Sequence, residues 1–261
     1  MRETSPKVYL IAKPRIDWNE IQRYLESIDG EEWLDHQCIE STQYSGESLI
    51  EFMGRLCYRS WIPGLNPNVT KVRKDRSEYL RNLLSSGHGS VLEHASYSFV
   101  FQDVSRVFTH ELVRHRVGVA ISQESLRYVR LTDIGFRIPK ILEPLRDRIV
   151  TLIDEMERFQ RDAADGIDVK PFSEKKKITS AIRRLAPLGL STTIGWTANI
   201  RTLRFVIEKR TELAAEEEMR IVFDQVASIM SKEEPHLFGD LTPTHEEDDA
   251  PATWTTEFSK V

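Results

Sequence analysis

The chain has 261 residues, enough for one large domain or two small ones. Its apolar and charged fractions are those of a soluble globular protein, and its net charge of -5 argues against general nucleic-acid binding, which needs a basic face. Two cysteines, Cys38 and Cys57, provide neither a disulfide framework nor a zinc site, and no run has the apolarity of a membrane span or signal peptide, so a cytoplasmic protein is expected.

The first hundred residues predict two strands and two helices. Strands are expected at residues 7–12 and 96–101, helices at 47–58 and 77–86, and a loop at 66–73. Residues 17–45 are mixed and acidic and show no clear period. Cys57 lies on the apolar side of its helix, which predicts a place in the core rather than a catalytic role.

The next elements alternate between helix and strand. Helices are expected after Asp103, at residues 143–164 and from Ser173 to Leu185. The stretch from Asn199 to Met230 is expected to form one long helix or two. Extended segments are expected at residues 128–138 and 190–198. Asp103 and Ser173 are the expected N-caps, and Asn199 is a plausible one. The helix after Asp103 is expected to turn Val104, Val107, Phe108 and Leu112 inward. The helix that begins near Ser173 is expected to turn Ile178, Ala181, Ile182 and Leu185 inward.

The tail after Asp240 has two prolines, four successive carboxylates from Glu246 to Asp249 and little apolar content. Such a composition is typical of segments that do not fold on their own. We therefore expect residues 1–240 to form a single domain and residues 241–261 to be a mobile acidic arm.

Arg114-His115-Arg116, with Arg127 eleven residues further on, is the most informative cluster. Neighbouring side chains on a helix or strand point in different directions, so the three cannot all bind one small carboxylate. They suit a ligand with several anionic oxygens, such as a nucleotide, because the guanidinium fork matches phosphate geometry. The plain alternative is a solvated charged face.

Other chemistries find little support. The five-residue spacing of His110 and His115 does not align two ligands on one helix face, so no metal site is expected. The chain has no Walker loop, no G-x-G-x-x-G fingerprint and no G-x-S-x-G elbow. Taken singly, Arg183, Arg201 and Arg210 are interpreted as surface arginines.

Several motifs together resemble the flavin-dependent thymidylate synthases, over the range from about Val8 to Gly239. The matching motifs are Arg55 to Tyr58, Gly87 to His94, His110 to Arg116, Ser122 to Tyr128 and Trp196 to Arg201. The Arg-His-Arg signature with its downstream Ser-x-Arg-Tyr is highly specific to that family.

The resemblance implies an α+β fold, a mixed sheet surrounded by helices, assembled as a homotetramer with active sites at subunit junctions. It implies an enzyme that moves a one-carbon unit from 5,10-methylenetetrahydrofolate to C5 of a uracil nucleotide. FAD reduced by NADPH supplies the hydride, and no cysteine nucleophile is required. The implied partners are the nucleotide, the folate and further copies of the chain, with no nucleic-acid polymer and no membrane.

The resemblance also implies roles residue by residue. Flavin contacts fall on Cys57, His88, Ser90, Glu93, Arg114, His115, Arg116, Asn199 and Arg201, the last two from another subunit. Nucleotide contacts fall on Glu111, Arg114, Gln123, Glu124, Ser125, Arg127, Arg183 and Arg210. Of these, Arg210 is the expected catalytic residue, since a cation at the uracil edge stabilises charge that develops on the ring oxygens.

The chain departs from the family pattern in two ways. Eight residues, Val117 to Glu124, separate Arg116 from Ser125 where the family has seven, and Phe205 and Ala214 replace polar residues. We expect the extra residue to bulge from Val117–Ser122, helped by Gly118, and to make room for a ribose hydroxyl. The chain is thus a candidate for the branch in polyoxin biosynthesis that methylates UMP as well as dUMP. A strict dUMP enzyme and an impaired flavin- or nucleotide-binding paralogue remain the alternatives.

Overall fold

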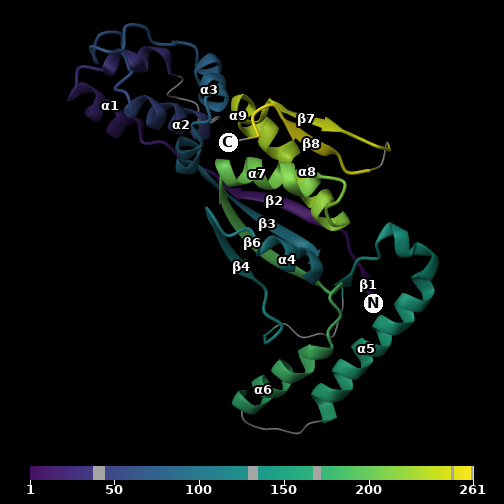
Figure 1. Ribbon diagram of the computed structural model, residues 1–261. Coiled ribbons are helices and arrows are strands. Elements are labelled where there is room, and N and C mark those ends of the chain that lie inside the picture. The colour runs from purple at the N-terminus through teal and green to yellow at the C-terminus, as the bar shows by residue number, and fades with distance from the viewer. Residues whose placement is uncertain (38–44, 129–134, 167–171, 248–249, 260) are drawn as a thin grey trace.

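A four-stranded antiparallel sheet forms the centre of the computed structural model, which describes residues 1–37, 45–128, 135–166, 172–247, 250–259 and 261 (Figure 1). Its strand order is β2-β3-β6-β4. The strands are β2 (Lys7–Ala12), β3 (Ser96–Ser105), β4 (Val119–Gln123) and β6 (Ser191–Asn199). The expected α+β class is confirmed. Parallel pairing occurs outside this sheet, between the short strands β1 (Arg2–Glu3) and β5 (Gly135–Phe136) and at one isolated bridge.

One face of the sheet forms the core. Because successive side chains of a strand point to opposite faces, every second residue of β3 faces the interior, and Tyr97, Phe99 and Phe101 are fully buried. Phe101 pairs with Ile194 of β6. Helices α4 (Arg106–Leu112), α7 (Ile200–Thr211) and α8 (Glu217–Glu233) cover this face. The side chains of the opposite face remain partly exposed.

A bulge ends the regular part of β3. The register with β6 shifts between Phe101 and Val104, and Asp103 adopts a left-handed backbone with φ of 58°. The prediction that Asp103 caps α4 is therefore wrong. The N-cap is Ser105, whose hydroxyl accepts the Phe108 N–H at 3.1 Å.

An aromatic lobe lies at one end of the sheet, in residues where no regular structure was predicted. It comprises α1 (Trp18–Glu26) and the short 3-10 helix η1 (Glu31–His36), packed on α2 (Ser45–Leu56). The rings of Phe52 and Trp61 lie 4.8 Å apart, and Trp33 lies 5.3 Å from Trp61. Helices α2 and α3 (Arg76–Ser85) agree with the predictions for residues 47–58 and 77–86.

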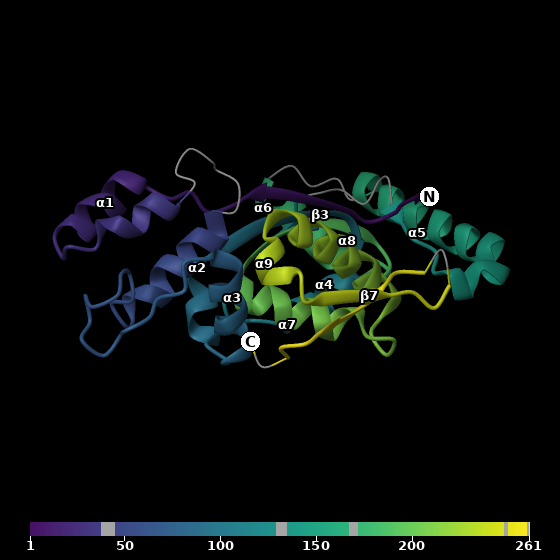
Figure 2. The same cartoon turned by 90° about the horizontal axis from the view of Figure 1, so that it is seen from above.

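An arm of two helices lies at the opposite end, as both views show (Figures 1 and 2). It comprises α5 (Arg146–Gly166), which follows the 3-10 helix η3 (Lys140–Leu145), and α6 (Phe172–Ile182), which continues into the 3-10 helix η4 (Arg183–Leu185). Helix α6 begins before Ser173, so that residue is not its N-cap, and Leu185 is 55% exposed rather than inward. Part of the segment predicted as extended, residues 129–134, lies outside the described residues.

The segment after Asp240 packs on the body, contrary to the expected mobile arm. After α9 (Pro235–Phe238), strands β7 (Leu241–Thr244) and β8 (Thr253–Thr256) form a hairpin whose Trp254 is buried. The buried Arg204 of α7 holds this segment through the Asp240 carboxylate, at 2.6 and 2.7 Å, and through Thr256 Oγ1 at 3.0 Å.

Among the described residues, no helix combines the length and apolarity that crossing a bilayer requires.

Candidate active site

The Arg-His-Arg cluster lies in the turn between α4 and β4. This turn packs beside the first residues of α7. It borders a cavity of about 290 Å³. The cavity is lined by Glu93, Arg114, His115, Arg116, Val117, Asn199, Arg201, Thr202 and Phe205. Six of these nine were predicted as flavin residues. Asn199 and Arg201 were expected to come from another subunit, but they line this cavity together with Arg114, His115 and Arg116 of the same chain.

The turn at Val117 and Gly118 docks directly on the first turn of α7. Gly118 has φ of 68°, and a Cβ there would lie 2.4 Å from Asn199 Nδ2, so a side chain does not fit. The Val117 carbonyl accepts from Thr202 Oγ1 at 2.9 Å. Asn199 is the predicted N-cap, since its Oδ1 accepts the Thr202 N–H at 2.9 Å.

The expected bulge across Val117–Ser122 stays a prediction, and the structure agrees with it only in the left-handed backbone of Gly118. From Val119 to Gln123, strand β4 pairs with β6 in continuous register. A one-residue shift in a strand would turn its inward residues outward, so the strand has no room for an insertion. We therefore expect the additional residue in the turn before β4 or after the end of β4 at Gln123.

An ion pair joins α7 to the 3-10 helix η2 (Gly89–His94). Arg201 Nη1 lies 2.6 Å from Glu93 Oε1. The guanidinium packs directly against the buried Gly89, where a Cβ would lie 2.8 Å from Arg201 Nε. The pair places a cation on the cavity wall in a defined orientation.

Arg210 binds His115 and Glu111 together. Its Nε donates to His115 Nε2 at 2.7 Å, and its Nη1 donates to Glu111 Oε2 at 3.0 Å. Burial and the charge of Arg210 lower the pKa of His115, in spite of Glu111. His115 is therefore neutral near pH 7, with Nε2 as acceptor and the proton on Nδ1.

Cys57, His88 and Ser90, which were also predicted as flavin residues, lie outside this cavity lining. The Tyr58 ring stacks on His88 with centroids 6.3 Å apart. Cys57 is exposed, so the prediction that it belongs to the core is wrong. Helix α2 ends at Leu56, and the chain turns before the apolar face reaches Cys57.

A second group of polar residues lies where β4 ends. Gln123 Nε2 donates to Thr109 Oγ1 of α4 at 3.2 Å, and the Glu124 carboxylate accepts the Thr193 N–H at 3.0 Å. Ser125 Oγ accepts the Arg127 N–H at 3.3 Å, which shapes the turn that follows. Gln123, Glu124, Ser125 and Arg127 thus share one corner.

Arg106 belongs to this corner, although the sequence motifs do not mark it. It donates to the Glu124 carbonyl at 3.2 Å, and its buried Nε has no hydrogen-bond partner among the described residues. Burial and the nearby charge of Arg183 lower its pKa. Two guanidinium groups near each other are suited to share one anion. A sequence signal exists, because a cation in the first turn of α4 opposes the helix dipole.

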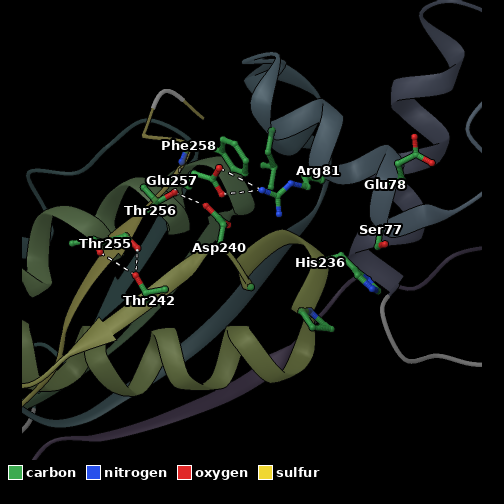
Figure 3. A pocket seen from close by; sticks show the side chains of 13 residues that line it. Ser77, Glu78, Arg81, His236, Asp240, Thr242, Thr255, Thr256, Glu257 and Phe258 are labelled. Atoms are coloured by element: carbon green, nitrogen blue, oxygen red, sulfur yellow. Dashed lines mark hydrogen bonds and ion pairs between the residues drawn. The ribbon is translucent and has the colours of Figure 1, made fainter.

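A larger cleft of about 860 Å³ lies elsewhere, between α3 and the C-terminal hairpin (Figure 3). The exposed ion pair of Arg81 and Glu257, at 3.2 Å, lies beside it, and His236 and Asp240 contribute to its wall. No residue predicted from sequence as a site residue lines this cleft. Cavity size alone therefore does not identify the candidate site.

Comparison with known proteins assigns the same region to one family. The family described as thymidylate synthase complementing protein matches residues 39–236. The chain is 30% identical over 249 residues to the flavin-dependent thymidylate synthase of Mycobacteroides abscessus, covering 90% of this chain and 87% of the relative. It is 32% identical over 207 residues to that of Clostridium tetani, covering 74% and 80%.

The fold also resembles a solved structure, that of thymidylate synthase X from Helicobacter pylori with FAD and dUMP. The TM-score is 0.56 with 21% identity, over 76% of this chain and 95% of the other. At this identity the likeness concerns the fold.

Proposed function

This chain belongs to the flavin-dependent thymidylate synthase family, and we propose that it methylates C5 of a uracil nucleotide with FAD as cofactor. One observation carries the proposal. Arg114 and Arg116 from the turn after α4, and Asn199 and Arg201 from the start of α7, line one cavity within the matched region.

The donor groups of this cavity fit FAD. Arg114 and Arg116 have no ion-pair partner among the described residues, and phosphate oxygens suit such guanidinium groups. We propose that Arg114 and Arg116 hold the phosphates, with Arg201, oriented by Glu93, beside them and with Asn199 and the neutral His115 as uncharged hydrogen-bonding neighbours. When bound and reduced, the flavin supplies a hydride.

The cavity of one chain is small for a dinucleotide cofactor, since drug-sized ligands already occupy about 300–1,000 Å³. We propose that further copies complete the site in a homotetramer, with His88, Ser90 and Cys57 meeting the flavin where a partner closes it. Light scattering on the FAD-loaded protein tests this proposal, and a monomer that holds stoichiometric FAD would refute it.

The nucleotide is proposed to lie at the corner where β4 ends. Arg106 and Arg183 would bind its phosphate, because their mutual repulsion is relieved by an anion between them. Gln123, Ser125 and Arg127 would hold the remainder. Glu111 and Glu124 would act indirectly, since Glu111 orients Arg210 and Glu124 caps the edge of β6.

Arg210 is proposed to stabilise negative charge at the uracil edge. Its ion pair with Glu111 and its bond to His115 fix the guanidinium before substrate arrives, which removes the cost of ordering it. We propose 5,10-methylenetetrahydrofolate as the carbon donor and NADPH as the reductant of the flavin.

We further propose that UMP and dUMP are both accepted. The support is the extra residue between Arg116 and Ser125, and the continuous register of β4 favours a place for it at the ends of that strand. Discrimination by one hydroxyl is large only where a site is built around it. Deletion of Val117, which lies before the strand, is expected to shift preference toward dUMP without changing the register of β4.

The test is tritium release from 5-tritiated UMP and dUMP, measured side by side with FAD, NADPH and methylenetetrahydrofolate. Comparable release from both supports the proposal. Release from dUMP alone would identify a strict dUMP enzyme. A yellow, FAD-containing protein that releases tritium from neither would be a paralogue without transfer chemistry.

A further inference from the structure

Phe205 is an apolar ring in the wall of a cavity whose other lining residues, with the exception of Val117, are polar or charged. It lies four residues after Arg201 on α7, so both side chains project from the same face of the helix. The side chain of Phe205 is 49% exposed. Its neighbours on α7, Leu203 and Val206, are fully buried, so the helix has an apolar face for the core and presents Phe205 elsewhere.

The ring of Phe205 is held in place by His115. The two rings meet at an angle of 67° with centroids 6.1 Å apart. His115 is fixed in turn, because Arg210 donates to its Nε2. Phe205 thus has a supported position in the cavity wall while half of its surface remains uncovered.

We propose that Phe205 is a stacking platform for a planar heteroaromatic ring of the cofactor, either the isoalloxazine or the adenine of FAD. The inference rests on the proposed function. Exposing an aromatic ring to water is unfavourable, and a flat π-system removes that cost, with an attraction beyond buried area. The arginines beside Phe205 would hold the phosphates that link the two rings, so ring and phosphate contacts belong to one ligand.

The position departs from the family pattern, in which a polar residue is usual. A hydrogen-bonding side chain there would select a ring by its edge, whereas Phe205 contacts a ring by its face. Stacking tolerates different ring edges, because every planar heteroaromatic ring has a π-face. This chain is therefore expected to depend on Phe205 for cofactor affinity.

The test is titration of the full-length protein with FAD, followed by flavin fluorescence, for four proteins. These are the wild type, Phe205→Leu, Phe205→Trp and Phe159→Leu. Phe159 on α5 is a matched control, since it is also 49% exposed and lies outside the cavity lining. Leucine keeps most of the apolar area but has no π-face, so Phe205→Leu should weaken FAD binding by about threefold to tenfold. Phe205→Trp should retain affinity, and Phe159→Leu should behave as the wild type.

Two shorter ligands identify the ring that stacks. FMN contains the isoalloxazine without adenine, and ADP contains adenine without isoalloxazine. If the isoalloxazine stacks on Phe205, Phe205→Leu should weaken FMN binding by the same factor as FAD binding and leave ADP binding unchanged. If the adenine stacks, ADP binding should weaken by that factor and FMN binding should not change.

The outcomes separate the inference from the function on which it rests. A wild-type protein that fails to bind FAD would overturn the proposed function. Wild-type binding with equal affinity in Phe205→Leu would overturn the stacking inference alone. A loss in Phe205→Leu that Phe205→Trp does not restore, accompanied by a changed oligomeric state in light scattering, would show that Phe205 packs subunits together and would also overturn it.

Discussion

Replacement of Arg204 by methionine is expected to destabilise the protein strongly, because the buried guanidinium has no substitute. Arg204 is 0% exposed and bonds to both carboxylate oxygens of Asp240, to Thr256 and to the Leu237 carbonyl. Although burial acts to raise the pKa of Asp240, its bonds to Arg204 hold that pKa below its usual value. Removing one partner of such a buried pair costs about 3–5 kcal/mol.

The assay is urea denaturation followed by tryptophan fluorescence, with Arg23→Met as control. Arg23 forms a comparable ion pair with Glu20 at 2.8 Å, but both side chains are well exposed. The control should therefore lose at most about 1 kcal/mol. Hydrogen exchange should also show lost protection in β7 and β8 for Arg204→Met. Equal, small losses in both variants would refute the view that Arg204 anchors the C-terminal segment.

Three further predictions follow from the site and its surroundings. Arg210→Ala should weaken nucleotide binding by about 1.5–3 kcal/mol, which is far more than its effect on FAD binding. The same variant should raise the pKa of His115, because it removes the cation that lowers that pKa. Unchanged nucleotide affinity in titration would exclude the role assigned to Arg210. Burial raises the pKa of Glu234 to about 7 from an ordinary value of 4.5, so the folded state retains a proton that the unfolded state releases. The unfolding free energy should therefore fall by on the order of 3 kcal/mol as the pH rises from about 4.5 to about 7. Glu234→Gln should flatten this dependence of the unfolding free energy on pH, as measured in urea titrations. The double variant Cys38→Ser, Cys57→Ser removes every thiol of the chain and should still transfer methyl groups, at a rate lowered only by the lost contact of Cys57 with the flavin, because no thiol nucleophile is required. Complete loss of turnover in a folded, FAD-binding protein would indicate a thiol nucleophile.

Local signals in the sequence predict much of this fold. Helical spacing places α2 and α3, and the polar residue at the start of an apolar run identifies Asn199 as the N-cap of α7. The prediction fails where a local rule is overridden. Asp103 has the chemistry of a cap, but the bulge in β3 carries the chain on to Ser105 before the helix begins.

Long-range contacts account for the larger errors. The C-terminal segment has the composition of a mobile arm, yet one buried tryptophan and the buried Arg204 hold it to the body, and this arginine lies far away in the sequence. At the site, the motifs identify six of the nine cavity residues. Arg106 has only a weak sequence signal, a cation in the first turn of α4, and it gains meaning when the fold brings it near Arg183.

The most direct test of the central claim is the mass of the nucleotide product. The protein is incubated with UMP or dUMP, methylenetetrahydrofolate and NADPH, with FAD and after removal of FAD. We predict a nucleotide with one additional methyl group, formed only when FAD is present. No methylated product from either nucleotide with FAD bound, or equal product without FAD, would contradict the account.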